Sequence, residues 1–243
     1  IGGIAKGQLV REVDALGGQM GLTADRSGIH FRMLNRSKGP AVQSPRCQAD
    51  KHLYARLMRA EIEASACGLI EDEVEGLWVE GSSLRGLRLA RQGQVQAQRV
   101  IITTGTFLNG LIHRGVERTP AGRIGEPPST GLPRELKELG FKLGRLKTGT
   151  PPRVRAGSLN FAAMEEQIPE SEPQPFSFRT QHIERPGISC HITYTNAETH
   201  RVIYDHIGEV PLYNGQIEGV GPRYCPSIED KVCRFRDKLR HQI

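Results

Sequence analysis

The sequence predicts a protein of the α/β class with the loop-rich architecture of nucleotide-binding folds. Glycine is plentiful, with 28 residues, and aromatic residues make up only 5% of the chain, which suits this class better than an all-β sandwich. The predicted elements run from helices through a small strand meander to a continuous apolar strand. With 243 residues, the chain can bury a real core, as one large or two small domains.

Two helices are predicted near the start of the chain. The first ends at Gly17-Gly18, because glycine after the last apolar position is a C-cap signal. Its apolar positions are Leu9, Val10, Val13 and Leu16. The second helix is longer and runs from about residue 49 to 66. Its apolar side is formed by Leu53, Leu57, Met58 and Ile62.

The segment from residue 69 to 97 predicts short strands, with turns near Gly81-Ser82 and Gln92-Gly93. The continuous apolar run at residues 100–102 then predicts a buried parallel strand. That run leads directly into Thr103-Thr104-Gly105. In nucleotide-binding α/β folds, ligands lie at the carboxyl ends of such strands, and a glycine there lets the backbone approach a cofactor closely.

Beyond Lys147 the chain becomes rich in proline and is expected to be extended. Apolar residues that alternate with polar ones over residues 188–194 predict a half-buried strand. Thr195 and Glu198 have the spacing of a capping box and predict the start of a helix. The apolar residues of that helix are Val202, Ile203 and Ile207.

The last motif is a glycine-rich loop that runs into a helix. Ser227 is the expected N-cap, and Asp230 completes a capping box. The apolar stripe consists of Ile228, Val232, Phe235 and Leu239. The amides at this helix start can bind an anion such as a pyrophosphate. Cys225 lies close to Arg223 and Lys231, a setting that favours a reactive thiolate, although a turn with a buried thiol fits the same residues.

Charge and composition restrict the remaining classes of partner and site. The formal net charge of +6 is compatible with an RNA partner, but the basic residues are spread along the chain and equally fit an ordinary solvated surface. The five cysteines form no C-x-x-C pair and the eight histidines show no metal-ligand spacing, so reduced thiols and no metal site are expected. Cys47 is expected to be a small residue at a helix start. No apolar run reaches membrane-spanning length.

Seven segments resemble, in order, signatures of the MnmG (GidA) family, flavoproteins that modify the wobble uridine of certain tRNAs. They are residues 1–7 (IGGIAKG), 12–18 (EVDALGG), 34–42 (LNRSKGPAV), 46–50 (RCQAD), 104–110 (TGTFLNG), 144–153 (GRLKTGTPPR) and 219–231 (GVGPRYCPSIEDK). The resemblance covers essentially the whole chain. It also implies an internal fragment, because the family's N-terminal G-x-G-x-x-G turn, which holds the FAD pyrophosphate, has no counterpart here, and the family continues past residue 243.

The resemblance implies a partial FAD-binding Rossmann-like fold of the two-dinucleotide-binding-domain flavoproteins, with an inserted NAD(H)-binding domain. Residues 1–148 are expected to form part of the FAD-binding domain, including the small meander. Residues 149–243 are expected to form an incomplete NAD(H)-binding domain.

The resemblance also assigns site residues. Val74 and the serine of the G-E-P-P-S motif, Ser129, correspond to family residues that contact FAD. Further cofactor contacts are expected from Thr104, Gly105, Thr106, Ser37, Lys38 and Gly39, and from Gly221, Pro222, Arg223, Tyr224, Ser227 and Lys231 in the segment that matches the family's NAD-binding residues. Cys225 matches a family cysteine proposed to act in catalysis. A thiolate that adds to C6 of uridine would make C5 more nucleophilic.

The implied activity is that of an FAD-dependent enzyme that forms 5-(carboxymethyl)aminomethyluridine at the wobble position of tRNA, with NADH and methylenetetrahydrofolate as co-substrates. Family members act as homodimers with the GTPase MnmE, and no membrane association is expected. The expected compartment is the cytoplasm or an organelle such as the mitochondrion. Two alternatives stay open: a folate- and FAD-dependent tRNA uridine methyltransferase, and an inactive fragment that binds nucleotide or tRNA weakly.

Overall fold

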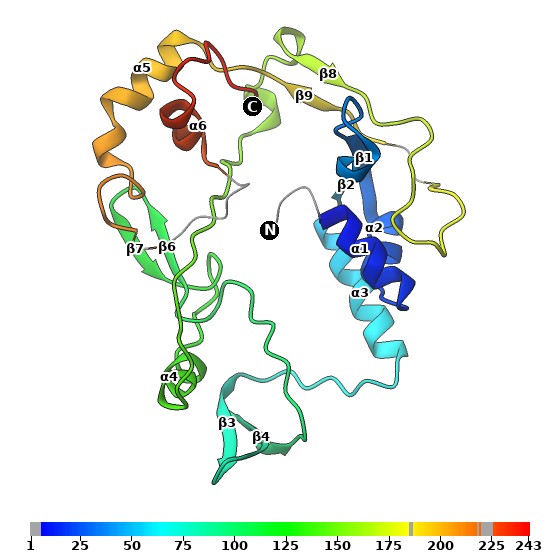
Figure 1. Ribbon diagram of the computed structural model, residues 1–243, viewed down its shortest axis with the longest axis vertical. Helices are drawn as coiled ribbons and strands as arrows, with labels where there is room; N and C mark the ends of the chain where they lie inside the picture. Colours follow the sequence, from blue (N-terminus) through cyan, green and yellow to red (C-terminus); the bar gives the residue numbers. More distant parts are fainter. Residues whose placement is uncertain (1–5, 185–186, 218, 220–225) are drawn as a thin grey trace. The chain divides into compact units, whose positions relative to one another are not determined.

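The computed structural model describes residues 6–184, 187–217, 219 and 226–243. The chain divides into two compact units (Figure 1). The first unit is built from residues 1–69, 148–204 and 221–243, and the second from residues 70–147 and 205–220. Among the described residues, no helix is long and apolar enough to cross a membrane.

The first unit opens with two helices, a β-hairpin and a third helix. Their bounds are α1 Lys6–Ala15, α2 Met20–Ser27, β1 Gly28–Leu34, β2 Ser44–Ala49 and α3 Lys51–Ala64. After α1, Gly17 has a φ of +89° and the N–H of Gly18 donates to the carbonyl of Val13, so the predicted glycine C-cap is confirmed. The predicted second helix is confirmed as α3. It begins where it does because the Asp50 carboxylate accepts two N–H groups of its first turn.

A small core lies between the hairpin and these helices. α1 and α2 both contact β2, and Figure 1 shows the three helices beside the hairpin. The core consists of Phe31, Phe176 and Ile183, with Val10, Ala24 and Cys47 packed against it. The apolar stripe predicted for the first helix mostly lies outside this core, since Leu9, Val13 and Leu16 are exposed, while Val10 packs against it. α1 instead buries Asp14, because that carboxylate accepts hydrogen bonds from Ser177 and Phe178.

The other elements of the first unit are short. They are η1 Pro40–Val42, η2 Ala156–Ser158, η3 Phe161–Ala163, β8 Glu165–Gln167, β9 Cys190–Ile192, α5 Ala197–Asp205 and α6 Ile228–Arg234. β8 and β9 pair in an antiparallel ladder. The predicted strand over residues 188–194 is therefore confirmed, but only over residues 190–192.

The capping box predicted for α5 is wrong by one residue. The Asn196 side chain accepts the N–H of Thr199 at 2.8 Å, so Asn196 caps the helix. Thr195 is buried, and its hydroxyl accepts the N–H of His241 at 2.7 Å. Glu198 is exposed on the first turn. The Thr195 hydroxyl could cap a helix, but it instead accepts a hydrogen bond from His241, which is distant in the sequence.

The capping box predicted for α6 is confirmed, because Ser227 and Asp230 each accept a backbone N–H from the other. The helix is shorter than its predicted apolar stripe. It ends at Arg234, and Leu239 beyond it is 89% exposed. Val232 is the apolar residue that α6 buries.

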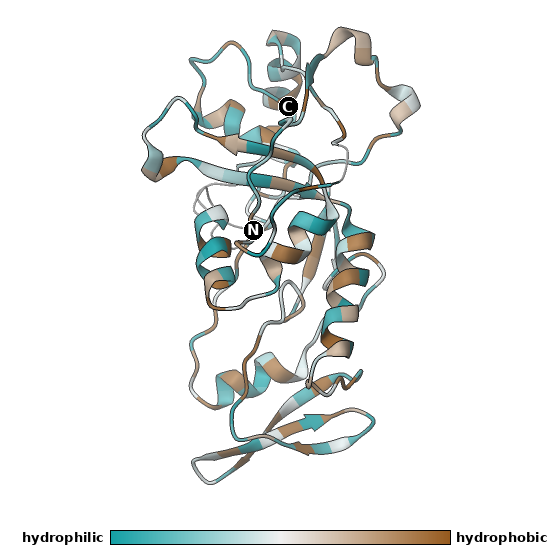
Figure 2. Ribbon diagram, turned by 90° about the vertical axis from the view of Figure 1, so that its right-hand side faces the viewer, coloured by the Kyte–Doolittle hydropathy of each residue, from teal (hydrophilic) through white to brown (hydrophobic). Residues whose placement is uncertain are grey.

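The second unit combines two small sheets with one helix. Its elements are β3 Val74–Glu80, β4 Ser83–Leu89, β5 Gly93–Gln96, β6 Leu111–Arg114, β7 Glu117–Pro120, α4 Gly131–Glu138 and η4 Ile207–Glu209. The predicted meander is confirmed: β3, β4 and β5 pair in order, with positive φ at Gly81 and Gly93 in the turns. Hydrophobic and hydrophilic residues are interleaved along β3 and β4 (Figure 2). α4 packs on β3, and the core is Leu77, Leu132 and Leu136.

The parallel strand predicted at residues 100–102 is wrong. These residues form no strand, and Ile101 is 87% exposed. A buried parallel strand needs hydrogen-bonded neighbours, and no described strand pairs with this segment. Of these three residues, only Val100 is among those that pack against the core of the second unit.

A unit boundary falls between Lys147 and Thr148, next to the expected domain boundary. The two units nevertheless do not follow the expected split into residues 1–148 and 149–243. Residues 148–204 belong to the same unit as residues 1–69. The assignment of residues 1–148 to FAD and of residues 149–243 to NAD(H) stays a prediction.

Candidate functional site

The second unit contains an open pocket of about 660 Å³. Loops form most of its wall, together with the first residue of β3 and the start of α4. The lining residues are Glu73, Val74, Thr103, Thr104, Gly105, Thr106, Phe107, Arg123, Pro127, Pro128, Ser129 and Leu132. Five residues predicted to contact a cofactor are among them: Val74, Thr104, Gly105, Thr106 and Ser129. The structure therefore brings together side chains that are up to 55 positions apart in the sequence.

Backbone hydrogen bonds join two loops that line this pocket. The N–H of Ser129 donates to the carbonyl of Phe107 at 2.9 Å, and the N–H of Asn109 donates to the carbonyl of Ser129 at 2.8 Å. Leu108 and Ser129 thus form an isolated parallel bridge. Because this bridge ties the G-E-P-P-S motif to the loop after residue 104, the position of Ser129 does not depend on side-chain packing alone.

Gly105 gives the pocket part of its shape. Its φ of +57° is a left-handed conformation that residues with a Cβ rarely adopt. The N–H of Phe107 donates to the carbonyl of Thr104 and closes the turn around it. A Cβ built on Gly105 would meet nothing within 4 Å, so the space in front of it is open. A ligand can therefore approach the backbone closely at this point.

Two further contacts set the polarity of the wall. The Thr106 hydroxyl donates to the carbonyl of Gly122 at 2.7 Å, so the loop orients this group. The Arg123 guanidinium lies 5.4 Å from the centroid of the Phe107 ring and pairs with Glu126 at 2.9 Å. Glu73 and Arg123 are the two charged residues in the lining. The pocket thus offers apolar surface, hydroxyl groups, backbone, one guanidinium and one carboxylate.

The pocket suits part of a nucleotide cofactor. Its volume lies in the range of about 300–1,000 Å³ that is typical of small-molecule sites. Apolar and aromatic side chains such as Val74 and Phe107 can cover a ring, while Ser129 and Arg123 can meet polar or anionic groups. Within the described residues, no group of three or more His, Cys, Asp or Glu side chains could hold a metal ion.

Other predicted contacts lie in the first unit. Ser37, Lys38 and Gly39 form an exposed turn, in which the N–H of Lys38 donates to the carbonyl of Asn35. Asn35 adopts a φ of +58° there. The Lys38 carbonyl accepts the Gln43 side chain at 3.2 Å. This geometry is a hydrogen-bonded turn with a solvated lysine, and a role in cofactor binding stays a prediction.

Two predicted NAD contacts lie at α6, Ser227 as its N-cap and Lys231 within it. Ser227 uses its hydroxyl to cap the helix, and the Lys231 ammonium donates to the carbonyl of Gln242 at 3.2 Å. The predicted catalytic Cys225 and its neighbours Gly221, Pro222, Arg223 and Tyr224 lie outside the described residues.

Sequence reasoning missed Phe107 and Arg123 as pocket residues. Phe107 lies inside the recognised segment TGTFLNG, next to its predicted contact residues, and Arg123 lies two residues before the G-E-P-P-S motif. Both positions were therefore detectable, since each lies in or beside a recognised motif. Their stacking contact was not, since it joins loops 16 residues apart.

The fold and this pocket define a mixed α/β protein with a loop-walled, small-molecule-sized site. The family model described as glucose inhibited division protein A matches residues 1–243, and the chain belongs to this GidA family. The predicted resemblance and the predicted fold class, with its partial FAD-binding Rossmann-like fold, are thereby confirmed.

Curated relatives and solved structures agree with this assignment. A protein of Thermodesulfovibrio yellowstonii named tRNA uridine 5-carboxymethylaminomethyl modification enzyme MnmG is 54% identical over all of this chain and 39% of its own length. A protein of the same name from Geobacter sulfurreducens is 51% identical, again over 39% of its length. The structure of Aquifex aeolicus GidA in its form I crystal superposes with a TM-score of 0.90 at 45% identity, covering all of this chain and 42% of that one. The chain thus spans about two fifths of these relatives.

Proposed function

We propose that this chain is part of an FAD-dependent enzyme that forms 5-(carboxymethyl)aminomethyluridine at the wobble position of tRNA. The supporting observation is that the pocket gathers Val74, Thr104, Gly105, Thr106 and Ser129, the residues expected to contact FAD in the second unit. The names of the relatives support the reaction and its tRNA substrate. The pocket is therefore proposed to hold part of the FAD.

The roles of the pocket residues follow from their chemistry. FAD, when bound, supplies the redox chemistry, and the protein binds and orients it. Val74 and Phe107 would cover apolar ring surface. Ser129 would donate or accept a hydrogen bond at a fixed position, because its backbone is bridged to Leu108. Gly105 would allow the backbone to approach the cofactor without a Cβ between them.

The further components of the reaction are proposals of the same kind. They are NADH as hydride donor, methylenetetrahydrofolate as one-carbon donor, a homodimer, and the GTPase MnmE as partner. The proposed compartment is the cytoplasm, with an organelle as the alternative. We also propose Cys225 as a nucleophile that adds to C6 of the uridine.

Flavin retention tests the pocket. The full-length protein is incubated with excess FAD and desalted, and its visible spectrum is recorded for wild type, Ser129→Phe and the control Ser82→Phe. Ser129→Phe introduces a ring into the pocket and should lose most bound flavin, whereas Ser82 lies in the turn between β3 and β4 and its variant should retain it. Stoichiometric flavin in Ser129→Phe would exclude this pocket as the FAD site.

Nucleoside analysis tests the reaction. tRNA from a strain that lacks the enzyme is incubated with the protein, FAD, NADH, methylenetetrahydrofolate, MnmE and GTP, with either ammonium or glycine as the amine donor, and then digested for mass spectrometry. We expect 5-aminomethyl or 5-carboxymethylaminomethyl uridine, which the variant Cys225→Ser should not form. Formation of 5-methyluridine would instead identify a methyltransferase. Absence of any product from the 243-residue chain, together with product from a longer version, would show that this chain alone is inactive.

A further inference from the structure

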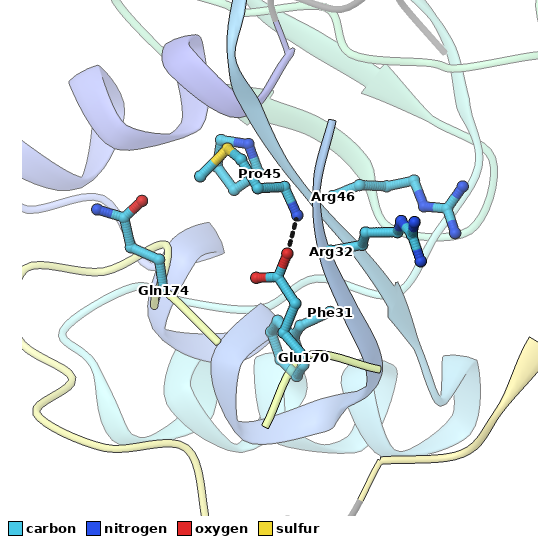
Figure 3. A pocket seen from close by; sticks show the side chains of 7 residues that line it. Phe31, Arg32, Pro45, Arg46, Glu170 and Gln174 are labelled. Atoms are coloured by element: carbon cyan, nitrogen blue, oxygen red, sulfur yellow. Dashed lines mark hydrogen bonds between the residues drawn. The ribbon is translucent and has the colours of Figure 1, made fainter. Parts of the chain in front are cut away.

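The β1–β2 hairpin places two arginines directly opposite each other. The strand register pairs Arg32 with Arg46. Directly opposite residues of an antiparallel pair have Cβ atoms only about 4.5–5.5 Å apart and lie on the same face. Figure 3 shows the two side chains next to each other, both extending away from the carboxylate of Glu170.

No described carboxylate forms an ion pair with either arginine of this pair. Glu170 is the nearest candidate, but its carboxylate accepts the N–H of Met33 at 2.9 Å and pairs with Arg36 at 2.7 Å. Burial would raise the pKa of Glu170, but these contacts and the nearby Arg32 outweigh it and hold that pKa below its ordinary value. Among the described residues, neither Arg32 nor Arg46 has a hydrogen-bond or ion-pair partner, and the Nε atom of Arg46 is buried without one.

The β6–β7 hairpin shows the opposite arrangement. In β6–β7 the register pairs Arg114 with Glu117, and their side chains form an ion pair at 2.6 Å. Like charges directly opposite each other destabilise a sheet, whereas opposite charges stabilise it. The Arg32–Arg46 pair therefore carries a repulsion that a bound anion would relieve.

The geometry of the pair fits a phosphate group. Each guanidinium presents planar N–H donors that match two phosphate oxygens, and two such groups side by side can hold one phosphate from both sides. The hollow beside Glu170 in Figure 3 has no room for a water molecule, so no small nucleotide can be enclosed there. The hairpin loop adds an exposed cation at Lys38, while Arg36 is paired with Glu170. These features fit an extended polyanion that lies on the surface.

We propose that Arg32 and Arg46 form a clamp for one phosphodiester group of an RNA strand that lies across the β1–β2 hairpin. The choice of RNA rests on the proposed function. The clamp supplies affinity and register rather than sequence specificity, since phosphate contacts position a nucleic acid without reading its bases.

Binding of unmodified tRNA to the full-length protein tests the clamp. Fluorescence anisotropy with labelled tRNA is measured between 50 and 200 mM salt for wild type and for Arg32→Gln/Arg46→Gln. The control is Arg85→Gln/Arg114→Gln, which removes the same charge from two exposed, ion-paired arginines. We expect the clamp variant to bind about tenfold more weakly and its log–log salt slope to fall by about 1, because one phosphate is no longer neutralised. The control should change neither quantity by as much.

The outcomes separate this inference from the proposed function. If wild type binds tRNA and the clamp variant binds with the same affinity and slope, the clamp is wrong and the proposed function stands. If wild type has no affinity for tRNA, the proposed function fails as well. Loss of FAD retention with unchanged tRNA affinity would also overturn the clamp, because the phosphate would then belong to the cofactor.

A second variant distinguishes loss of the phosphate contact from misfolding of the hairpin. Arg32→Lys/Arg46→Lys keeps both charges but loses the planar donor geometry. We expect tRNA affinity between those of wild type and the glutamine variant, with the salt slope of wild type. Removing the repulsion should leave the melting temperature of the glutamine variant unchanged or higher. A lower melting temperature would mean that the arginines stabilise the hairpin, contrary to the clamp.

Discussion

The Ser177 hydroxyl donates a 2.7 Å hydrogen bond to the carboxylate of Asp14 and joins helix α1 to a segment 163 residues further along the chain. Asp14 also accepts the N–H of Phe178, and another buried carboxylate, Asp25, accepts the N–H groups of Phe176 and Ser177. Buried N–H groups outside helices and strands need acceptors. The two aspartates supply them, and this allows Phe176 to enter the core without regular secondary structure.

Asp14→Asn should therefore destabilise the first unit. The amide keeps the shape of the side chain but presents N–H donors where the carboxylate accepts hydrogen bonds. We expect the free energy of unfolding to fall by about 2 kcal/mol, because a buried donor loses its charged acceptor. Urea unfolding followed by circular dichroism measures the change. Glu12→Gln, on an exposed position of the same helix, should change stability by less than about 0.5 kcal/mol. Equal effects of the two variants would contradict this role of Asp14.

The same carboxylate predicts a pH dependence. Burial would raise the pKa of Asp14, but the hydrogen bonds from Ser177, Phe178 and Arg179 outweigh it and hold the pKa below its ordinary value of 3.8. A lowered folded-state pKa stabilises the protein above the unfolded value, and this contribution is lost as the pH falls through the folded value. The stability difference between wild type and Asp14→Asn should be constant near neutral pH and shrink below pH 3.8. A difference that grows toward acid would have the wrong sign.

The fold could be predicted wherever a local signal sets the structure. The C-cap at Gly17, the N-cap at Ser227 and the meander turns at Gly81 and Gly93 depend on residues a few positions apart, and all are confirmed. Predictions that need distant partners were less successful. Thr195 is held by His241, 46 residues away, and the apolar run at residues 100–102 has no described strand to pair with. Sequence periodicity contains no information on such partners.

Gly105 makes a third prediction possible. Alanine at a φ of +57° is strained by roughly 1–2 kcal/mol, although its Cβ would have open space. We expect Gly105→Ala to lower the free energy of unfolding by about that amount and to weaken FAD retention, because the turn that shapes the pocket wall relaxes. The matched control is Gly144→Ala, where the space is equally open and φ is not in the left-handed region. Both quantities are measured on the same preparations. A Gly105→Ala protein as stable as Gly144→Ala would show that the turn tolerates a side chain.

The residues of the candidate site could be predicted only where they lie in or beside a recognisable sequence feature. Ser129 and the T-G-T turn were found because they lie in motifs that resemble a family, and Val74 because it matches a family valine in the short strand after the long helix. The structure places all of them in one pocket. Arg123 was missed, since its position over Phe107 follows from the bridge between two loops. The opposition of Arg32 and Arg46 was missed too, because it depends on the register of a hairpin whose loop length no motif fixes.

Cysteine reactivity gives a last prediction. Cys47 was expected at a helix start, but it lies on β2, where its Sγ atom contacts the carbonyl of Ala24 beside the Phe31 core. Burial, with a smaller contribution from the charge of Asp25, raises the pKa of this thiol to about 12. At pH 8 only about one molecule in ten thousand would then carry the reactive thiolate.

Iodoacetamide at pH 8 should therefore modify the exposed Cys67 and leave Cys47 unmodified, as peptide mass spectrometry can show. In denaturant both thiols should react, since the burial that protects Cys47 is lost on unfolding. Native-state labelling of Cys47 at the rate of Cys67 would mean that the packing of β2 against the core opens readily. The same experiment measures the reactivity of Cys225, for which the proposed catalytic role predicts modification at least as fast as that of Cys67. Slow labelling of Cys225 would argue against an activated thiolate at that position.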